Sequence, residues 1–203
     1  MAFQHRHVDI FPNSNYKILK DDSKTEPKSA MDEKLMALMH KFNETGLVET
    51  MQLVMLVEQH GHPHVLLLQP HPKFSLLPHT EIKPDETSKE TVHRILQEQF
   101  QVAEPALNQF RIVDLAAVWW RPHFEQPTYP YQPPHVTKPK ERIQVVLVQM
   151  PESCDFVVPG NGNVRAVPLI ELYDNKESFG QLIATLPQTL SRYDVEMHKD
   201  DFS

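Results

Sequence analysis

An apolar hairpin followed by a capped helix constrains the fold of this chain more than any other feature. Residues 50–58 are rich in Val, Leu and Met and predict a buried strand, and residues 64–69 (His-Val-Leu-Leu-Leu-Gln) predict its hairpin partner. After a proline-rich loop, Thr87-x-x-Glu90 forms a capping-box pattern, and apolar residues at helical spacing continue to Phe100. The chain therefore passes from paired strands to a helix.

Further elements repeat this alternation. Ser29-x-x-Asp32 is another capping box and predicts a helix that stops at Gly46, while strands are expected near residues 110–118 and 142–150. A last helical stretch is predicted over residues 179–193, with an interruption at Pro187. Strands that alternate with helices predict an α/β layered domain.

The length of 203 residues fits one domain with a sizeable core. Residues 29–195 are predicted to form this domain. Residues 1–28 lack a clear period and are interpreted as an extended arm, docked through Ile10, Phe11 and Tyr16. Residues 196–203 are expected to be a frayed tail.

Composition excludes several classes of protein. No apolar run has the length needed to cross a bilayer and the first residues lack a secretory pattern, so a soluble intracellular protein without membrane partners is expected. The single cysteine, Cys154, excludes an internal disulfide and is interpreted as a small core or strand residue. The net charge of −7 argues against a broad phosphate-binding surface, so any contact with nucleic acid is expected to be local and to use stacking.

Residues 80–102 contain a degraded metal-binding pattern. They align without a gap to the Nudix hydrolase box, G-x5-E-x7-R-E-U-x-E-E-x-G-U, in which U is apolar and helical glutamates hold divalent cations against a pyrophosphate. The positions that match the box are Glu86, Arg94, Leu96 and Glu98. The first glycine, two glutamates and the last glycine are replaced by Thr80, Ile95, Gln99 and Gln101. Magnesium on a pyrophosphate needs several converging carboxylates, so the sequence predicts a retained helix with no catalytic residues and no cofactor.

Several unusual runs carry a more specific resemblance. They are residues 64–69, Trp119-Trp-Arg-Pro122, Tyr129-Pro-Tyr131, Lys138-Pro-Lys-Glu141, Glu171-Leu-Tyr-Asp-Asn175 and Leu190-Ser-Arg192. With them, the chain resembles the small subunit of cleavage factor I, a family of nuclear Nudix-fold homodimers in pre-mRNA 3′-end processing. That family binds UGUA elements upstream of poly(A) sites and recruits a large subunit with an RNA-recognition motif. The resemblance runs from Ile10 to Tyr193 and implies a Nudix α/β/α sandwich with a mixed sheet and an extended N-terminal arm.

The resemblance also implies an RNA site built from the loop before the box helix, the first helix and the last helix. Phe74 is similar to an aromatic residue on which a base stacks, with Leu77 as its apolar neighbour. Glu26 matches a contacting acid and Gly180 a glycine near the RNA.

Other positions of this implied site depart from the family. An arginine is replaced by Lys34, a glutamate by Gln52, a second phenylalanine by Ser75 and a tyrosine by Phe179, and His79-Thr80 replaces a glycine pair. A base–aromatic stack is worth about 1–3 kcal/mol, so losing two or three such terms would reduce affinity by orders of magnitude. The implied member is therefore a divergent one with weakened or altered RNA preference.

A proline-rich segment between residues 121 and 139 is the candidate surface for the large subunit. Glu125, Tyr129 and Tyr131 are the residues expected there, because rigid rings with polar tips are enriched at interfaces. The alternative is a proline-stiffened cover over the domain. Trp119 and Trp120 point to opposite sides if they lie in a strand, so at least one of them is expected in the core.

Histidines at positions 60, 62 and 64 alternate across the predicted turn. Neighbouring side chains of a tight hairpin point apart and no acid or cysteine completes a ligand set, so no metal site is expected.

Two alternatives to RNA recognition remain open. One is a dimeric adaptor that docks its partner and has lost RNA recognition, which the acidic charge favours. The other is a working hydrolase of dinucleotide polyphosphates, which Ile95 and Gln99 disfavour.

Overall fold

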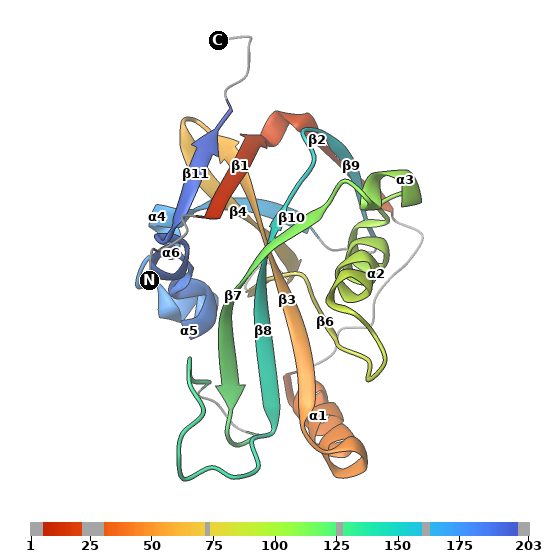
Figure 1. The fold of residues 1–203 in the computed structure, drawn as a ribbon, viewed down its shortest axis with the longest axis vertical. Coiled ribbons are helices and arrows are strands. Elements are labelled where there is room, and N and C mark those ends of the chain that lie inside the picture. The colour runs from red at the N-terminus through yellow and green to blue at the C-terminus, as the bar shows by residue number, and fades with distance from the viewer. Residues whose placement is uncertain (1–5, 22–30, 72–73, 125–127, 160–162, 199–203) are drawn as a thin grey trace.

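The computed structural model describes residues 6–21, 31–71, 74–124, 128–159 and 163–198. These residues form a large mixed sheet with helices on both sides (Figure 1). The strands are β1 (Arg6–Pro12), β2 (Tyr16–Asp21), β3 (Val48–Gln59), β4 (His62–His71), β5 (Phe74–Leu76), β6 (His79–Glu81), β7 (Arg111–Arg121), β8 (Glu141–Gln149), β9 (Cys154–Pro159), β10 (Asn163–Pro168) and β11 (Tyr193–Met197). The helices are η1 (Asn13–Asn15), α1 (Met31–Thr45), α2 (Ser88–Phe100), α3 (Glu104–Leu107), α4 (Leu169–Leu172), α5 (Lys176–Ala184) and α6 (Leu186–Leu190).

Strand β3 is the centre of the sheet. It pairs antiparallel with β4 through the predicted hairpin, whose turn residues His60 and Gly61 have φ angles of 55° and 75°. It also pairs parallel with β8, and β8 pairs antiparallel with β7. β10 extends the sheet beyond β4, and β1 continues it from β3 to β11. The expected hairpin and the strands near 110–118 and 142–150 are confirmed.

The core lies on both faces of this sheet, which makes three layers. Met51, Leu53 and Met55 of β3 pack toward α2, whereas Val54 and Leu56 pack toward α5 and α6. Figure 1 shows α2 and α3 on one side of the sheet and α4–α6 on the other. A strand covered on both faces needs apolar residues at successive positions, which explains the continuous apolar run of β3. The α/β/α sandwich expected from the sequence is confirmed.

The capping box predicted for α2 is present. The hydroxyl of Thr87 accepts from the Glu90 N–H, and the carboxylate of Glu90 accepts from the Thr87 N–H at 2.7 Å. The helix buries Val92, Ile95, Leu96 and Phe100. These apolar residues hold α2 against the sheet, so the position of the helix follows directly from its spacing.

Part of the expected N-terminal arm is built into the sheets. Residues 6–21 form β1, η1 and β2, with Ile10 and Tyr16 buried and Phe11 half-buried. β1 pairs parallel with β3 and β11, and β2 pairs parallel with β9. The sequence predicted docking by side chains but missed this pairing, because a parallel partner leaves no turn signal nearby. Residues 22–30, with the capping box at Ser29, lie outside the described residues.

The helical stretch predicted over residues 179–193 forms two helices, α5 and α6. Pro187 lies in the first turn of α6, where its missing N–H is harmless. β11 runs into the expected tail as far as Met197, because it pairs with β1.

The predicted stop of α1 at Gly46 is confirmed, since the φ angle of Gly46 is 82° and its N–H donates to the Phe42 carbonyl at 2.9 Å. No helix among the described residues is long and apolar enough to span a membrane.

Candidate functional site

The box helix α2 has lost its metal-facing carboxylates to packing and backbone contacts. Ile95, at a glutamate position, is fully buried in the core between α2 and the sheet. Because Ile95 belongs to a core cluster that includes Met51, Leu53 and Val146, an apolar side chain is stabilised by burial there and a carboxylate would be desolvated. The expectation that Ile95 would face the core is confirmed.

Gln99 occupies the second lost glutamate position and binds the backbone of β6. Its Nε2 donates to the carbonyl oxygen of His79, and its Oε1 accepts from the N–H of His79 at 3.2 Å. The two bonds use both ends of the amide. A carboxylate could accept but could not donate, so glutamine is the residue that fits this contact.

Arg94 holds the loop before the helix. Its Nε donates to Glu86 Oε1 at 2.8 Å and its Nη2 to Glu86 Oε2 at 2.6 Å. Nη1 donates to the hydroxyl of Thr80 at 2.8 Å, and Nη2 also reaches the carbonyl of Glu81. The hydrogen bond from Arg94 lowers the pKa of Glu86 to about 2. This pair holds the loop against the helix of the box, although two of the three metal glutamates are replaced.

Glu98 is the one carboxylate left at the metal positions. Its side chain is 55% exposed, and its Oε2 lies 3.7 Å from Nη1 of Arg94. A single exposed carboxylate beside a buried isoleucine and an engaged amide does not fit magnesium, which binds oxygen ligands in near-ideal octahedral geometry. The donor set of the box therefore does not support metal-dependent hydrolysis.

The residues that the resemblance assigned to RNA fall into exposed and buried groups. Phe74 lies in β5 and is 57% exposed, and α5 packs against β5. Gly180 interrupts α5 with φ 78° and ψ 166°, a conformation that is essentially restricted to glycine. The structure thus places an exposed ring and a bare, irregular backbone on two adjacent elements.

Leu77 and Phe179 are not exposed. Leu77 is 2% exposed and Phe179 is 9% exposed, and both belong to the core that α5 and α6 cover. Their assignment to RNA binding stays a prediction, and in this structure both side chains are covered by the core. Their apolar side chains are stabilised by burial.

Among the remaining positions of the implied site, the structure describes Gln52 and the backbone of Lys34. Gln52 is half-buried on β3 and pairs with His79 of β6. An ion pair of 2.8 Å between Lys41 Nζ and Glu81 Oε1 connects α1 to β6. Lys34 lies in α1, but its side chain and all of Glu26 lie outside the part of the chain that the structure describes.

The proline-rich segment folds back onto the sheet through its tyrosines. Tyr129 exchanges two backbone hydrogen bonds with Trp120, at 2.7 and 2.8 Å. Its ring lies 5.8 Å from that of Tyr131, which is 57% exposed. Glu125 lies outside the described residues. Two neighbouring aromatic rings with polar tips thus lie on a segment that is anchored to β7.

The paired tryptophans behave as strand alternation predicts. Trp119 is 3% exposed and belongs to the core, whereas Trp120 is half-buried with the guanidinium of Arg142 5.8 Å from its ring.

Cys154 is buried in β9, as expected for a strand residue, and burial raises the pKa of its thiol. In the hairpin, His64 is buried with Nδ1 2.9 Å from the carbonyl oxygen of His62.

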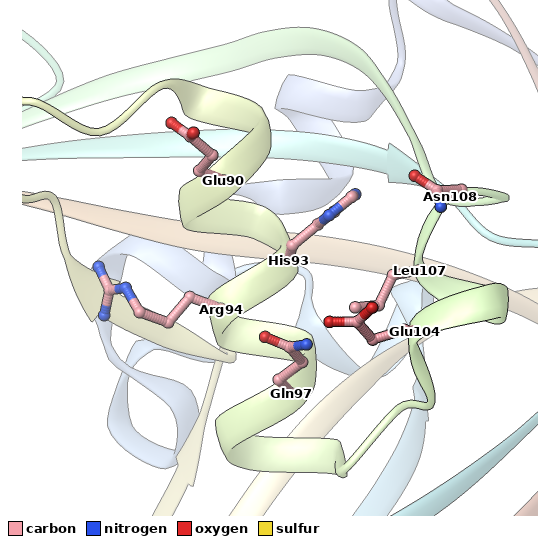
Figure 2. Close-up of a pocket in the computed structure, with 7 residues that line it drawn as sticks. All are labelled: Glu90, His93, Arg94, Gln97, Glu104, Leu107 and Asn108. Atoms are coloured by element: carbon pink, nitrogen blue, oxygen red, sulfur yellow. The ribbon is translucent and has the colours of Figure 1, made fainter.

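A pocket of about 420 Å³ lies away from these surfaces, between α2 and α3. Figure 2 shows His93 pointing from α2 toward Asn108, Glu104 pointing toward α2, and Arg94 pointing to the other side. Burial lowers the pKa of His93, and the Nε2 of this ring has no hydrogen-bond partner among the described residues. None of the residues implied in RNA binding lines this pocket.

The sandwich, the capped helix α2 and the retained Glu86–Arg94 pair define a Nudix-fold protein whose box has lost its metal ligands. A family model described as nucleotide hydrolase (NUDIX_2) matches residues 6–193. The chain is 37% identical over 191 residues to pre-mRNA cleavage factor Im 25 kDa subunit 2 of Arabidopsis thaliana, covering 94% of this chain and 96% of that protein. It is 34% identical over 183 residues to cleavage and polyadenylation specificity factor subunit 5 of Dictyostelium discoideum, covering 89% of this chain and 90% of that protein.

The chain belongs to the Nudix-fold family of these cleavage factor Im 25 kDa subunits. Its relatives support a role in mRNA 3′-end processing.

Proposed function

We propose that this protein is a non-catalytic, RNA-reading subunit of cleavage factor I that acts as a homodimer in the nucleus. It binds UGUA-type elements in pre-mRNA and docks a large subunit with an RNA-recognition motif, and so guides cleavage and polyadenylation. The observation that carries this proposal is the exposure of Phe74 on β5 beside α5, next to a box that lacks a magnesium donor set.

Stacking supplies the proposed affinity. An aromatic ring offers a face to any base, and such a stack is worth about 1–3 kcal/mol. Base identity would be read by other positions that the resemblance assigns to the site, among them Gly180, Gln52 and Lys34. Lysine provides one point charge where a guanidinium would provide a planar fork, so we expect weaker discrimination between bases than an arginine gives.

The negative net charge of the chain favours recognition by base stacking over recognition by phosphate binding. With a net charge of −7, few counterions are released on binding, so the affinity should depend weakly on salt. Two sites in a homodimer would then raise the apparent affinity for RNA that carries two elements.

Fluorescence anisotropy with labelled UGUA RNA and a scrambled control, at two salt concentrations, tests the proposal. Phe74→Ala should reduce the affinity for UGUA RNA by about 5- to 150-fold, which corresponds to the loss of one stack. Tyr131→Ala is a matched control, because both side chains are 57% exposed aromatic groups. It should leave RNA affinity unchanged and weaken capture of the large subunit.

An adaptor without RNA recognition is a second candidate function. The acidic net charge and the residues Lys34, Gln52 and Ser75 favour it. Equal binding of both RNAs by the wild-type protein, together with intact capture of the large subunit, would establish this alternative and refute RNA reading.

A further inference from the structure

We propose that His7, Asp9, Glu196 and His198 form a binding site for a divalent transition-metal ion of the zinc class. The ion would fasten the last strand of the sheet, β11, to the first, β1. This site is separate from the RNA-reading surface, and its function would be structural.

Strand pairing brings these four residues to one face. β1 and β11 are parallel neighbours in which His7 pairs with Asp194 and Asp9 pairs with Glu196. Val8 and Ile10, each 1% exposed, face the core, so the alternation of a strand turns His7 and Asp9 outward. Figure 1 shows β1 and β11 side by side, near the C-terminal end of the chain.

Three of the ligand atoms, on His7, Asp9 and Glu196, all lie within 4.8 Å of one another. Nε2 of His7 lies 3.1 Å from Oδ1 of Asp9 and 3.2 Å from Oε2 of Glu196. Nε2 of His198 lies 3.1 Å from the same Oδ1 of Asp9. Around a tetrahedral zinc ion with nitrogen and oxygen ligands at about 2.0–2.2 Å, neighbouring ligand atoms are about 3.3–3.5 Å apart. Most of these separations need to change by only a few tenths of an ångström.

Hydrogen bonds alone do not satisfy all of the side-chain atoms in this cluster. A neutral imidazole nitrogen carries either one hydrogen or one lone pair, yet Nε2 of His7 faces two carboxylate oxygens. Asp194 adds a third carboxylate, with Oδ2 3.9 Å from Nδ1 of His7. A divalent cation would accept lone pairs from both rings and neutralise the converging carboxylates.

The backbone beneath the cluster is firmly held. Gln149, which is buried, accepts from the Asp9 N–H at 2.9 Å and donates to the Asp9 carbonyl at 2.7 Å. The N–H of His198 donates to the Ile10 carbonyl at 3.0 Å, and its ring stacks on Phe11 with centroids 4.9 Å apart. Ligands fixed in this way lose little conformational freedom on binding.

The ligand chemistry selects the kind of ion. Two imidazoles with two carboxylates suit zinc, whereas magnesium and calcium prefer sites made of oxygen alone. Asp194 behind His7 corresponds to the carboxylate that often orients a metal-bound imidazole.

Isothermal titration of the untagged, EDTA-treated full chain with zinc chloride tests this site. We expect one zinc ion per chain and no saturable binding of magnesium. At zinc concentrations about 100 times the dissociation constant, the unfolding midpoint should rise by about 5 °C or more. His7→Gln and Glu196→Gln should each weaken binding by about tenfold or more.

His60→Gln is the matched control, since it removes an exposed histidine from the hairpin and should leave zinc affinity unchanged. Glu196→Gln guards against misfolding, because the Glu196 side chain is 61% exposed. Visible absorption of bound cobalt gives a second readout, with a tetrahedral spectrum expected in the wild type and lost in both site variants. Zinc binding that is absent, or that His7→Gln and Glu196→Gln leave unchanged, would overturn the proposal.

Discussion

The amide of Gln99 binds both backbone groups of His79, donating to its carbonyl and accepting from its N–H at 3.2 Å. This contact joins the box helix α2 to β6, and so holds the segment that leads from β5 to the helix. Position 99 would carry a metal-binding glutamate in a hydrolase. In this protein it stabilises the segment that runs from β5, which contains Phe74, to α2.

Gln99→Glu should destabilise the protein by about 1–3 kcal/mol, because a carboxylate cannot donate to the His79 carbonyl. Urea denaturation measures this change, with Gln97→Glu, at an exposed position of the same helix, as the control. The substitution should not produce magnesium-dependent hydrolysis of dinucleotide polyphosphates, since Ile95 remains in the core. Equal stability of the two variants would show that the contact with His79 is dispensable.

The Glu86–Arg94 pair should make stability depend on pH in acid. Arg94 lowers the pKa of Glu86 in the folded protein from 4.5 to about 2. The stabilisation is therefore fully present above a pH of about 4.5 and is lost as the pH falls toward about 2.

Glu86→Gln should cost about 1–3 kcal/mol at neutral pH and should flatten this acid dependence, which urea midpoints across the acid range would reveal. Glu98→Gln is the control on the same arginine, because its exposed pair should change stability by less than about 1 kcal/mol. An acid profile of Glu86→Gln that matches the wild type would contradict the assignment.

Gly180→Ala should destabilise the protein by about 1–3 kcal/mol through backbone strain. A Cβ atom there would meet no atom within 4 Å, so a steric clash is not the cause. Thermal unfolding tests this, and Ser178→Ala, at an exposed position of α5, should leave the midpoint nearly unchanged. If both variants melt together, the bend in α5 is not held rigidly.

The thiol of Cys154 should react many times more slowly with a disulfide reagent in the folded protein than in urea. Its residue is 8% exposed and burial raises the pKa of the thiol, so little thiolate reaches solvent. Absorbance of the released thiolate follows the rate. Fast reaction without denaturant would show that β9 opens readily.

The sequence determined the elements whose signals are local. The hairpin of β3 and β4, the capping box of α2 and the stop at Gly46 all depend on residues a few positions apart. The incomplete carboxylate set of the box could also be seen in the sequence, because Ile95 and Gln99 lack carboxylates whatever the fold. Strand alternation correctly predicted that Trp119 and Trp120 would differ in burial.

Tertiary structure alone decided which side chains meet. Phe179 of α5 and Leu77, which follows β5, were assigned to RNA by resemblance, yet both side chains pack into the same core cluster. Asp9 and His198 are 189 positions apart, yet their side chains lie 3.1 Å from each other. Parallel pairing of β1 and β11 aligns side chains from opposite ends of the chain on one face. The physical reason is that a strand fixes the direction of its side chains locally, while its partner is chosen by the packing of the whole sheet.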